Sequence, residues 1–577
     1  MKTTTLVESR VECRLRDGVV LYADVYRPIG DGRHPVLLER TPYGRATYLI
    51  NGMPLDPLRA AAAGFAVVIQ DVRGRWDSEG DFYPFATESA DGYDAVEWCA
   101  TQSWSSGQVG MYGSSYMAAT AWQAARAAPP SLVTMTPSQA SSDYYEGRSY
   151  RGGVLELGSL LTSALLGLAP GSAHRMESST AKAALRKARQ MIDDPLTTAA
   201  TAPLAALRET PLSDLAPFFF DWVEHDTFDE YWQGLTLESS YANIKIPVLH
   251  MTSWFDSFLI GSLHNYEGMA LAGHRHQHLV IGPWTHHVPM AALLGSAVVG
   301  EMDCGLGSML DFDRIQLRWF RSVFDSGEPP ADQPTVMYFL MGANRWQTGE
   351  TWPPPSTELR LYLASRGHAN TLAGDGRLET HEPDSEAESD TFIYDPVNPV
   401  PTLGGSQLMI GTSCPPGSYD QRPVEGRDDV LVFTSEPLRE DLDVVGWVSA
   451  TLSVASTALD TDFTAKLVDV SPSGRALNIC DGARRLRLRE SLSELLNYTP
   501  GEVCAVVIRM DATGHRFCHG HAIRLEVSSS NFPRFAVNPN TGYTAFTDTA
   551  RIKATQTIFH SKESPSFLQL PVVRMDR

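Results

Sequence analysis

The stretch over residues 109–128 constrains the fold of this chain more than any other part of it. A short apolar run leads into Gly113-Ser114-Ser115-Tyr116, and an alanine-rich run then continues up to Pro129-Pro130. A strand, a tight turn on small residues and a helix, in this order, are typical of the strained turn that exposes a serine at the edge of an α/β sheet. Ser115 fits this turn better than Ser114, because only Ser115 has a glycine two residues before it.

This match leaves an alternative open. The full pattern is Gly-x-Ser-x-Gly, and Met117 stands at its last glycine position. A glycine–serine turn that merely caps a helix would have a similar sequence. The serine therefore needs support from other parts of the chain.

The first third of the chain alternates between strand-like and helix-like segments. Short apolar runs bounded by Pro, Gly or charged residues are typical of strands buried in a parallel sheet. Helical patterns between such runs predict an α/β fold, in which helices cover both faces of a mostly parallel sheet. The predicted strands cover residues 19–26, 36–39 and 66–70, and the predicted helices cover 58–63 and 91–101.

The middle of the chain is helical in composition, most clearly over residues 159–168 and 181–192. We predict a helical insertion over residues 145–240, which interrupts a catalytic domain made of residues 1–144 and 241–355. Within the second part of that domain, strand signals return at 246–251 and 279–281, and a closing helix is expected at 315–324.

The sequence pattern changes again after Trp352-Pro353-Pro354-Pro355. Many short β-branched or alternating segments separated by turn residues predict an all-β sandwich or jelly roll over residues 356–577. The polar, acidic run over residues 367–389 is expected to be a solvated loop. The predicted strands cover residues 359–363, 445–454, 462–470, 503–510 and 523–527.

An acid and a histidine follow two of the later predicted strands. Asp256 lies just beyond the strand at 246–251, and His286 and His287 lie just beyond the strand at 279–281. Open α/β sheets form their sites at the carboxyl ends of strands. Serine, acid and histidine in this chain order are the arrangement of α/β-hydrolases, so the chain order supports Ser115 as a nucleophile.

Composition excludes several other classes of protein. A net charge of −21 argues against a nucleic-acid partner, which requires a basic surface. The seven cysteines include no CxxC pair, so a zinc ribbon or a thiol redox site has no support. The first residues lack the apolar core of a signal peptide, and no apolar run is long enough to span a membrane. We therefore expect a soluble, cytoplasmic protein.

Three alternating histidines, His274, His276 and His278, would share one face of a strand and could resemble a metal site. No carboxylate stands at a supporting spacing, and no HExxH motif occurs. A solvated strand edge is the favoured interpretation. We predict no metal and no cofactor.

Several motifs, in order along nearly the whole chain, resemble those of the cocaine esterase and X-Pro dipeptidyl-peptidase-like group of serine hydrolases. The three around the serine, the acid and the histidine are GMYGSSYMAATAWQAA, SWFDSF and IGPWTHH. RTPYG near Tyr43, VIQDVRGRWDSEGDF and DTDFTAKLVDV extend the resemblance into both end domains. One departure is that Ala118 stands where the family usually has glycine, a difference of a single methyl group.

The resemblance implies an α/β-hydrolase core, a helical insertion over the site and a C-terminal jelly roll. It implies a catalytic triad of Ser115, Asp256 and His286, with His286 preferred over His287. It also implies an oxyanion hole formed by the Tyr43 hydroxyl and the Tyr116 N–H, a role for which a neutral phenol is suited. Further implied features are substrate contacts from Phe258, Leu408 and Met409, and ion pairs of Arg73 with Asp77 or Glu79.

The function predicted from this set is ester hydrolysis through an acyl-enzyme intermediate. Relatives that bind a free α-amino group carry acidic residues just after the nucleophile and just after the catalytic acid. Here those positions read Met117-Ala118 and Ser257-Phe258-Leu259, and only Asp143 and Glu146 remain as substitutes. We therefore expect esters of small or medium apolar acyl groups to be the substrates.

Other functions stay open as alternatives. The same fold could serve an X-Pro dipeptidyl-peptidase, an α-amino acid ester hydrolase, an amide or β-lactam acylase, or an acyltransferase. A non-catalytic protein that binds ligands through its jelly roll is the alternative from another class. The expected partner is a small-molecule ester or amide, without nucleic acid or membrane, and a homodimer is compatible with the sequence.

Overall fold

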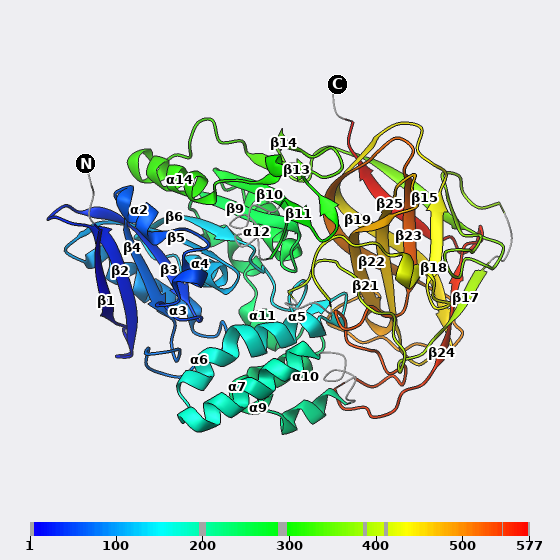
Figure 1. Ribbon diagram of the computed structural model, residues 1–577, viewed down its shortest axis with the longest axis horizontal. Coiled ribbons are helices and arrows are strands. Elements are labelled where there is room, and N and C mark those ends of the chain that lie inside the picture. Colours follow the sequence, from blue (N-terminus) through cyan, green and yellow to red (C-terminus); the bar gives the residue numbers. More distant parts are fainter. Residues whose placement is uncertain are drawn as a thin grey trace.

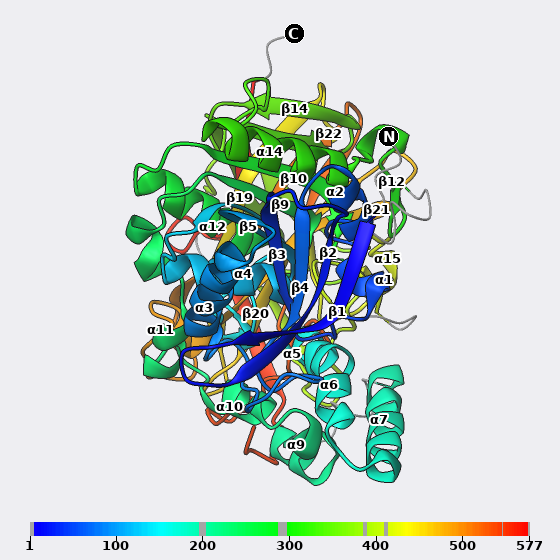
Figure 2. The same cartoon turned by 90° about the vertical axis from the view of Figure 1, so that its left-hand side faces the viewer.

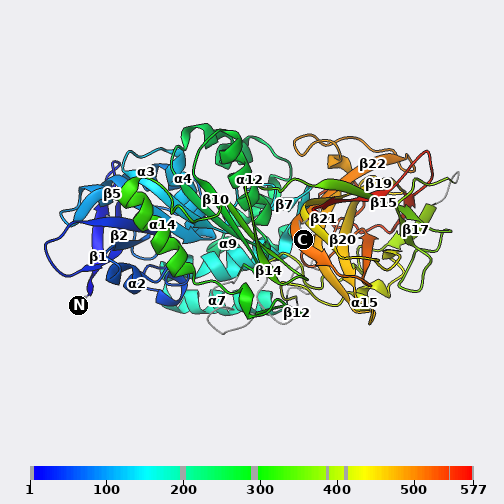
Figure 3. The ribbon, with the colours of Figure 1, turned by 90° about the horizontal axis from the view of Figure 1, so that it is seen from above.

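The computed structural model describes residues 5–194, 203–286, 297–384, 389–408, 414–544 and 546–574. Two large sheets lie at opposite ends of an elongated molecule (Figure 3). In the view of Figure 1, a layer of helices lies below the first sheet and the junction between the two sheets. Within the described residues, no helix has the length and apolar character required to cross a lipid bilayer.

The first sheet has ten strands in the order β1-β2-β4-β3-β5-β6-β9-β10-β13-β14. Neighbours from β4 to β13 pair in parallel, and the outer pairs are antiparallel. This confirms the mostly parallel sheet predicted from the alternation of strands and helices. The strands are β1 (Thr5–Arg14), β2 (Val20–Pro28), β3 (His34–Thr41), β4 (Ala66–Asp71), β5 (Ser105–Ser114), β6 (Leu132–Ser138), β9 (Val248–Phe255), β10 (Gln277–Thr285), β13 (Val336–Leu340) and β14 (Arg345–Gly349).

Helices cover both faces of this sheet, as Figure 2 shows from the side of β1. Alternate residues of β3 explain this arrangement, because Leu37 packs with α2 (Pro57–Ala62) and α14 (Phe312–Ser326), whereas Val36 and Leu38 pack on the opposite face. The opposite face is covered by α3 (Glu88–Thr101), α4 (Tyr116–Arg126) and α12 (Leu259–Leu271). Strands buried on both faces read as continuous apolar runs, which is why the sequence revealed them.

Short helices fill the chain between β8 (Val154–Leu155), which pairs with β7 (Tyr150–Arg151), and β9. They fall inside the predicted insertion over 145–240, except that the last of them runs to Asn243, and the exact limits of the insertion stay a prediction. A π-helical segment, η1 (Ser163–Leu168), continues the first of them. The other elements are α5 (Leu157–Thr162), α6 (Ala169–His174), α7 (Ser178–Asp193), η2 (Leu204–Glu209), α9 (Leu212–Leu215), α10 (Phe218–Glu224), α11 (Glu230–Leu235) and η3 (Glu238–Asn243).

The second sheet has eleven strands and occupies the C-terminal part of the chain. The segment predicted to be a solvated loop, 367–389, in fact contributes β16 and the first residue of β17. That prediction failed because a three-residue strand leaves little periodic signal. The strands are β15 (Thr357–Ala364), β16 (Arg377–Glu379), β17 (Ser389–Tyr394), β18 (Leu431–Ser435), β19 (Leu442–Ser456), β20 (Asp462–Val470), β21 (Ala476–Arg485), β22 (Cys504–Phe517), β23 (Ala522–Ser528), β24 (Ala554–Phe559) and β25 (Phe567–Val572).

A buried cluster of charges joins the insertion to the C-terminal sheet. Arg151 and Glu156 come from the insertion, and Arg534 and Asp511 come from the C-terminal part. Arg151 pairs with Asp511, and an Arg534 nitrogen lies 3.3 Å from a Glu156 oxygen. All four side chains are almost fully buried, so each charge depends on its partners.

Candidate active site

Ser115 occupies a strained turn between β5 and α4. Its backbone has φ 62° and ψ −126°, a conformation that residues other than glycine rarely adopt. Gly113 makes the turn possible, since a Cβ atom there would lie 2.6 Å from the Cβ of Met117. The Ser115 N–H donates to the Ser138 carbonyl at 3.0 Å, which ties the turn to β6.

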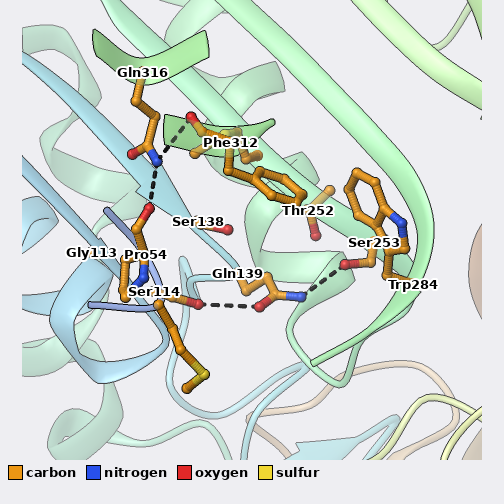
Figure 4. Close-up of a pocket in the computed structure, with 12 residues that line it drawn as sticks. Pro54, Gly113, Ser114, Ser138, Gln139, Thr252, Ser253, Trp284, Phe312 and Gln316 are labelled. Atoms are coloured by element: carbon orange, nitrogen blue, oxygen red, sulfur yellow. Dashed lines mark hydrogen bonds between the residues drawn. The ribbon is translucent and has the colours of Figure 1, made fainter. Parts of the chain in front are cut away.

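The neighbouring Ser114 points away from Ser115. Its hydroxyl donates to Oε1 of Gln139 at 3.1 Å. It lines a cavity of about 400 Å³ behind the turn, together with Ser253 and Trp284 (Figure 4). Ser115 lines a separate pocket on the other side. The structure therefore distinguishes the two serines in the way expected from the glycine spacing.

Asp256 and His286 meet at the carboxyl ends of β9 and β10. Nδ1 of His286 lies 2.9 Å from Oδ1 of Asp256, and this carboxylate oxygen also accepts the Phe258 N–H at 2.9 Å. Asp256 is fully buried. The Phe258 ring packs edge-on against the imidazole, with 5.0 Å between ring centres. The acid thus fixes the orientation of the imidazole through Nδ1.

The Tyr43 phenol lies near the Ser115 side chain and the Tyr116 backbone, and the three residues line the same pocket. Burial raises the pKa of the Tyr43 phenol above its usual value. A phenol with a raised pKa stays protonated at neutral pH, so it can donate a hydrogen bond. Both predicted oxyanion donors therefore lie beside Ser115.

A buried chain of polar groups, which the sequence did not reveal, holds Tyr116. The Tyr116 hydroxyl donates to Glu88 at 3.1 Å and accepts the Phe85 N–H at 3.0 Å. Glu88 in turn pairs with Arg40 at 2.6 Å, and both side chains are buried. The Phe85 ring stacks on Tyr116, with 4.6 Å between ring centres. This chain fixes the first residue of α4 and with it the Tyr116 N–H.

The pocket in front of Ser115 has a volume of about 300 Å³. Phe258, which the family resemblance implies as a substrate contact, is among the residues that line it. Leu408 is not among its lining residues; it is buried, with its N–H 3.3 Å from the hydroxyl of Ser159. Met409 lies outside the described residues. The lining consists of Tyr43, Phe85, Ser115, Tyr116, Ala119, Gln139, Ser141, Tyr144, Arg148, Ser163 and Phe258.

No acidic side chain lines this pocket within the described residues. Asp143 accepts the Tyr145 N–H at 2.8 Å, and Glu146 accepts the Gly152 N–H at 3.1 Å. Burial raises the pKa of Asp143 to about 7. These two carboxylates, the only predicted substitutes for an ammonium-binding pair, thus serve the loop that carries them.

Two pocket residues, Gln139 and Arg148, escaped the sequence reasoning. Both belong to the loop between β6 and β7, in which the sequence indicates only Asp143 and Glu146 as candidate site residues. Gln139 has φ 56° and is 2% exposed, and its amide contacts Ser114, Ser253 and the carbonyl of Thr285. An amide or a guanidinium in a loop carries no sequence signal of burial, so neither could have been separated from a solvated residue.

The charged segment after β4 forms ion pairs, but the predicted partners were wrong. Arg73 pairs with Asp91 at 2.7 Å and with Asp17 at 2.8 Å. Asp77 pairs instead with Arg45, at 2.8 Å. Glu79 accepts a backbone N–H from β2. These partners come from distant elements, which local spacing along the chain does not specify.

The three alternating histidines have separate partners. His274 Nε2 lies 2.7 Å from the Tyr241 carbonyl, and His276 Nε2 lies 3.0 Å from Glu328. His278 Nδ1 lies 2.9 Å from the Pro334 carbonyl. No group of three or more ligand-type residues that could hold a metal ion occurs in the described part of the chain.

A strained serine at a strand–turn–helix junction, with an acid–histidine pair at the ends of two later strands, defines a serine hydrolase of the α/β-hydrolase class. Comparison with known proteins agrees with this class. Residues 17–288 match the X-Pro dipeptidyl-peptidase (S15 family), and residues 330–569 match the X-Pro dipeptidyl-peptidase C-terminal non-catalytic domain. The second match begins before β13, which still belongs to the first sheet.

Among curated relatives, the cocaine esterase of Rhodococcus sp. (strain MB1 Bresler) is 38% identical over 98% of this chain and 99% of its own. A solved α-amino acid ester hydrolase is 26% identical, with a TM-score of 0.82 over 99% of this chain and 97% of its own. An aminopeptidase from the archaeon Thaumarchaeota archaeon shares the fold at 24% identity, with a TM-score of 0.84 over 100% and 97%. The chain belongs to the cocaine esterase and X-Pro dipeptidyl-peptidase-like family, and it is a serine ester hydrolase.

Proposed function

We propose that Ser115, His286 and Asp256 form the catalytic triad through which this protein hydrolyses carboxylic esters. The supporting observation is the 2.9 Å contact between His286 and buried Asp256, at the same sheet edge as the strained Ser115. Ser115 Oγ attacks the ester carbonyl carbon while Nε2 of His286 takes its proton. Asp256 orients the imidazole and stabilises its charged form.

The carbonyl oxygen then carries a negative charge, which the Tyr43 hydroxyl and the Tyr116 N–H stabilise by hydrogen bonds. Collapse of this intermediate breaks the bond to the alcohol, and the alcohol leaves with the proton from His286. Water then attacks the acyl-Ser115 ester, with His286 again acting as base, and the acid product and the free serine are released. The same cycle with an alcohol or amine in place of water would be acyl transfer, which a product analysis with added nucleophile detects.

The pocket supports an ester with a compact, largely apolar acyl body. Phe85, Tyr144 and Phe258 supply aromatic surface beside Ser115. Binding the free ammonium of an X-Pro peptide would require a carboxylate in the pocket, since an unpaired buried charge is costly. We therefore propose that simple esters are better substrates than X-Pro amides.

A fluorophosphonate probe tests the nucleophile. Wild type and Ser114→Ala should be labelled and active, whereas Ser115→Ala should lose labelling and at least about a thousandfold in kcat. Labelling that persists in Ser115→Ala would move the nucleophile elsewhere, and a folded wild type that never labels would favour a binding protein.

Substrate preference is tested by kcat/KM for a para-nitrophenyl acyl ester and for an X-Pro para-nitroanilide. We expect the ester to be preferred. An anilide value equal to or above that of the ester would overturn the substrate assignment without affecting the triad.

A further inference from the structure

A buried arginine lies in the wall of the pocket that contains Ser115. Arg148 is only 6% exposed. Its guanidinium carbon lies 4.2 Å from the ring centre of Trp222 and 5.0 Å from that of Phe85. Its one hydrogen bond in the described structure runs from Nη1 to the Ser149 hydroxyl at 3.1 Å. A guanidinium has five N–H donors, so most of its capacity is unused.

Each of the other buried arginines has a carboxylate or backbone carbonyl partner within the protein. Six of them pair with carboxylates. Arg75, which lies near the same site, donates to two backbone carbonyls and to the Ser172 hydroxyl. Only Arg148, among these side chains of the described residues, has neither kind of partner. The six pairs are Arg40–Glu88, Arg45–Asp71, Arg151–Asp511, Arg485–Asp462, Arg524–Glu425 and Arg534–Asp481.

The surroundings of Arg148 explain why it remains charged. Burial lowers its pKa to about 10, which still leaves the guanidinium protonated at neutral pH. The titratable groups that face it are Tyr144, Tyr231, Tyr116 and Tyr43, and no carboxylate is among them. Aromatic faces stabilise a cation partly, but a desolvated charge without an anion remains costly. A ligand that supplies the anion would remove this cost.

We propose that Arg148 binds a carboxylate group that the substrate carries in addition to the ester attacked by Ser115. The two side chains line the same pocket, so one small molecule can reach both. The planar guanidinium matches a carboxylate with two parallel hydrogen bonds. The otherwise apolar ester expected from the sequence would thus carry an anionic group.

This inference rests on the proposed esterase function, and the substrate carboxylate could belong to the acyl part or to the alcohol part. The para-nitrophenyl hemiester of adipic acid places it in the acyl part. The same ester with its free carboxylate capped as a methyl ester is the matched neutral probe. Carboxyphenyl acetate, compared with phenyl acetate, places the carboxylate in the alcohol part.

We expect wild type to prefer at least one anionic ester over its neutral match by about tenfold to a hundredfold in kcat/KM, the size of a charge-assisted hydrogen bond. Arg148→Met, which keeps most of the side-chain volume, should lower kcat/KM far more for that anionic ester than for its neutral match. Arg148→Lys, which keeps the charge but loses the planar fork, should give an intermediate ratio. Arg75→Lys is the control, because its donors are used internally, and it should not change the anionic-to-neutral ratio.

Two results would overturn the inference. One is a wild type that shows no preference for either anionic ester. The other is an Arg148→Met variant that loses activity equally on charged and neutral esters. That result would mean that the Arg148 guanidinium stabilises the oxyanion and does not bind a substrate carboxylate. If Arg148→Met fails to fold, as judged by thermal denaturation and probe labelling, the wild-type preference and Arg148→Lys decide. A wild type that hydrolyses none of the anionic or neutral esters and is not labelled at Ser115 would instead refute the proposed function.

Discussion

The side-chain amide of Gln139 donates a hydrogen bond to the carbonyl of Thr285, at 3.1 Å. Thr285 ends β10 and directly precedes the predicted catalytic histidine. The same nitrogen donates to Ser253 of β9 at 2.8 Å, and Oε1 accepts from Ser114 of β5 at 3.1 Å (Figure 4). One side chain therefore joins the ends of the three strands that position Ser115, Asp256 and His286.

Gln139→Met should separate the ends of these strands while it preserves the side-chain volume. We expect kcat for a neutral aryl ester to fall about tenfold to a hundredfold, because small displacements of catalytic groups are costly. KM should change much less, which identifies Gln139 as a positioning residue. Gln139→Glu keeps an acceptor for Ser114 and loses both donors, so it should show the same split. An unchanged kcat in both variants would limit Gln139 to a packing role.

Tyr43→Phe removes one proposed oxyanion donor and leaves the ring in place. The lost hydrogen bond strengthens only as charge develops, so kcat should fall about a hundredfold to a thousandfold with little change in KM. Because burial raises the pKa of the Tyr43 phenol above its ordinary value of about 10, the wild-type donor stays protonated in mildly alkaline solution. The ratio of wild type to Tyr43→Phe should therefore stay constant from about pH 7 to pH 9. A rise in KM alone would place Tyr43 in ground-state binding.

The strands that carry the candidate catalytic residues could be predicted because their signal is local in the sequence. Ser115, Asp256 and His286 each follow a short apolar strand, and such runs are visible without knowledge of the tertiary structure. The strand order of the sheet, the short β16 and the partners of Arg73 depend on contacts between distant segments. Local periodicity does not record these contacts.

The same limit applies inside the site. Arg148 and Gln139 could be identified only from the folded structure. It shows that both side chains are buried and which partners each of them has. Their residue types are ordinary for a surface loop, so composition gave no indication of them. Burial and the hydrogen-bond partners of a side chain are properties of the folded molecule.

Asp143 predicts a dependence of stability on pH. Its folded-state pKa is raised to about 7, mainly by burial and further by Glu238 and Glu146. A carboxyl whose pKa is higher in the folded state stabilises the fold below its unfolded pKa, and this contribution is lost as the pH rises through the folded pKa. Asp143→Asn, which can still accept the Tyr145 N–H, should be more stable than wild type at about pH 8, by about 2–4 kcal/mol.

Urea denaturation at several pH values measures this difference. It should shrink as the pH falls from about 7 toward 4 and disappear below the unfolded-state pKa of about 3.9, where Asp143 is protonated in both the folded and the unfolded state. A difference that is independent of pH would show that Asp143 contributes through packing or hydrogen bonding alone.

The C-terminal sheet should be required for a stable active site. It supplies Asp511 to the buried Arg151, and its Gly514 carbonyl accepts the Met341 N–H at 2.9 Å. Gly514 also packs against Trp254, two residues before Asp256; a Cβ atom at Gly514 would lie 2.7 Å from that ring. A fragment of residues 1–355 would expose all of these contacts, so we expect it to be insoluble or inactive.

Arg151→Met tests the same interface in the full chain. It leaves the buried Asp511 without its main partner, so the free energy of unfolding should fall by about 3–5 kcal/mol. The matched control is Arg475→Met, which breaks a 2.8 Å pair with Glu301 whose two side chains are 44% and 41% exposed. That change should cost about 0–1 kcal/mol, because water already screens the pair. A soluble, fully active 1–355 fragment, or an Arg151→Met variant as stable as the control, would show that the catalytic domain does not depend on this contact.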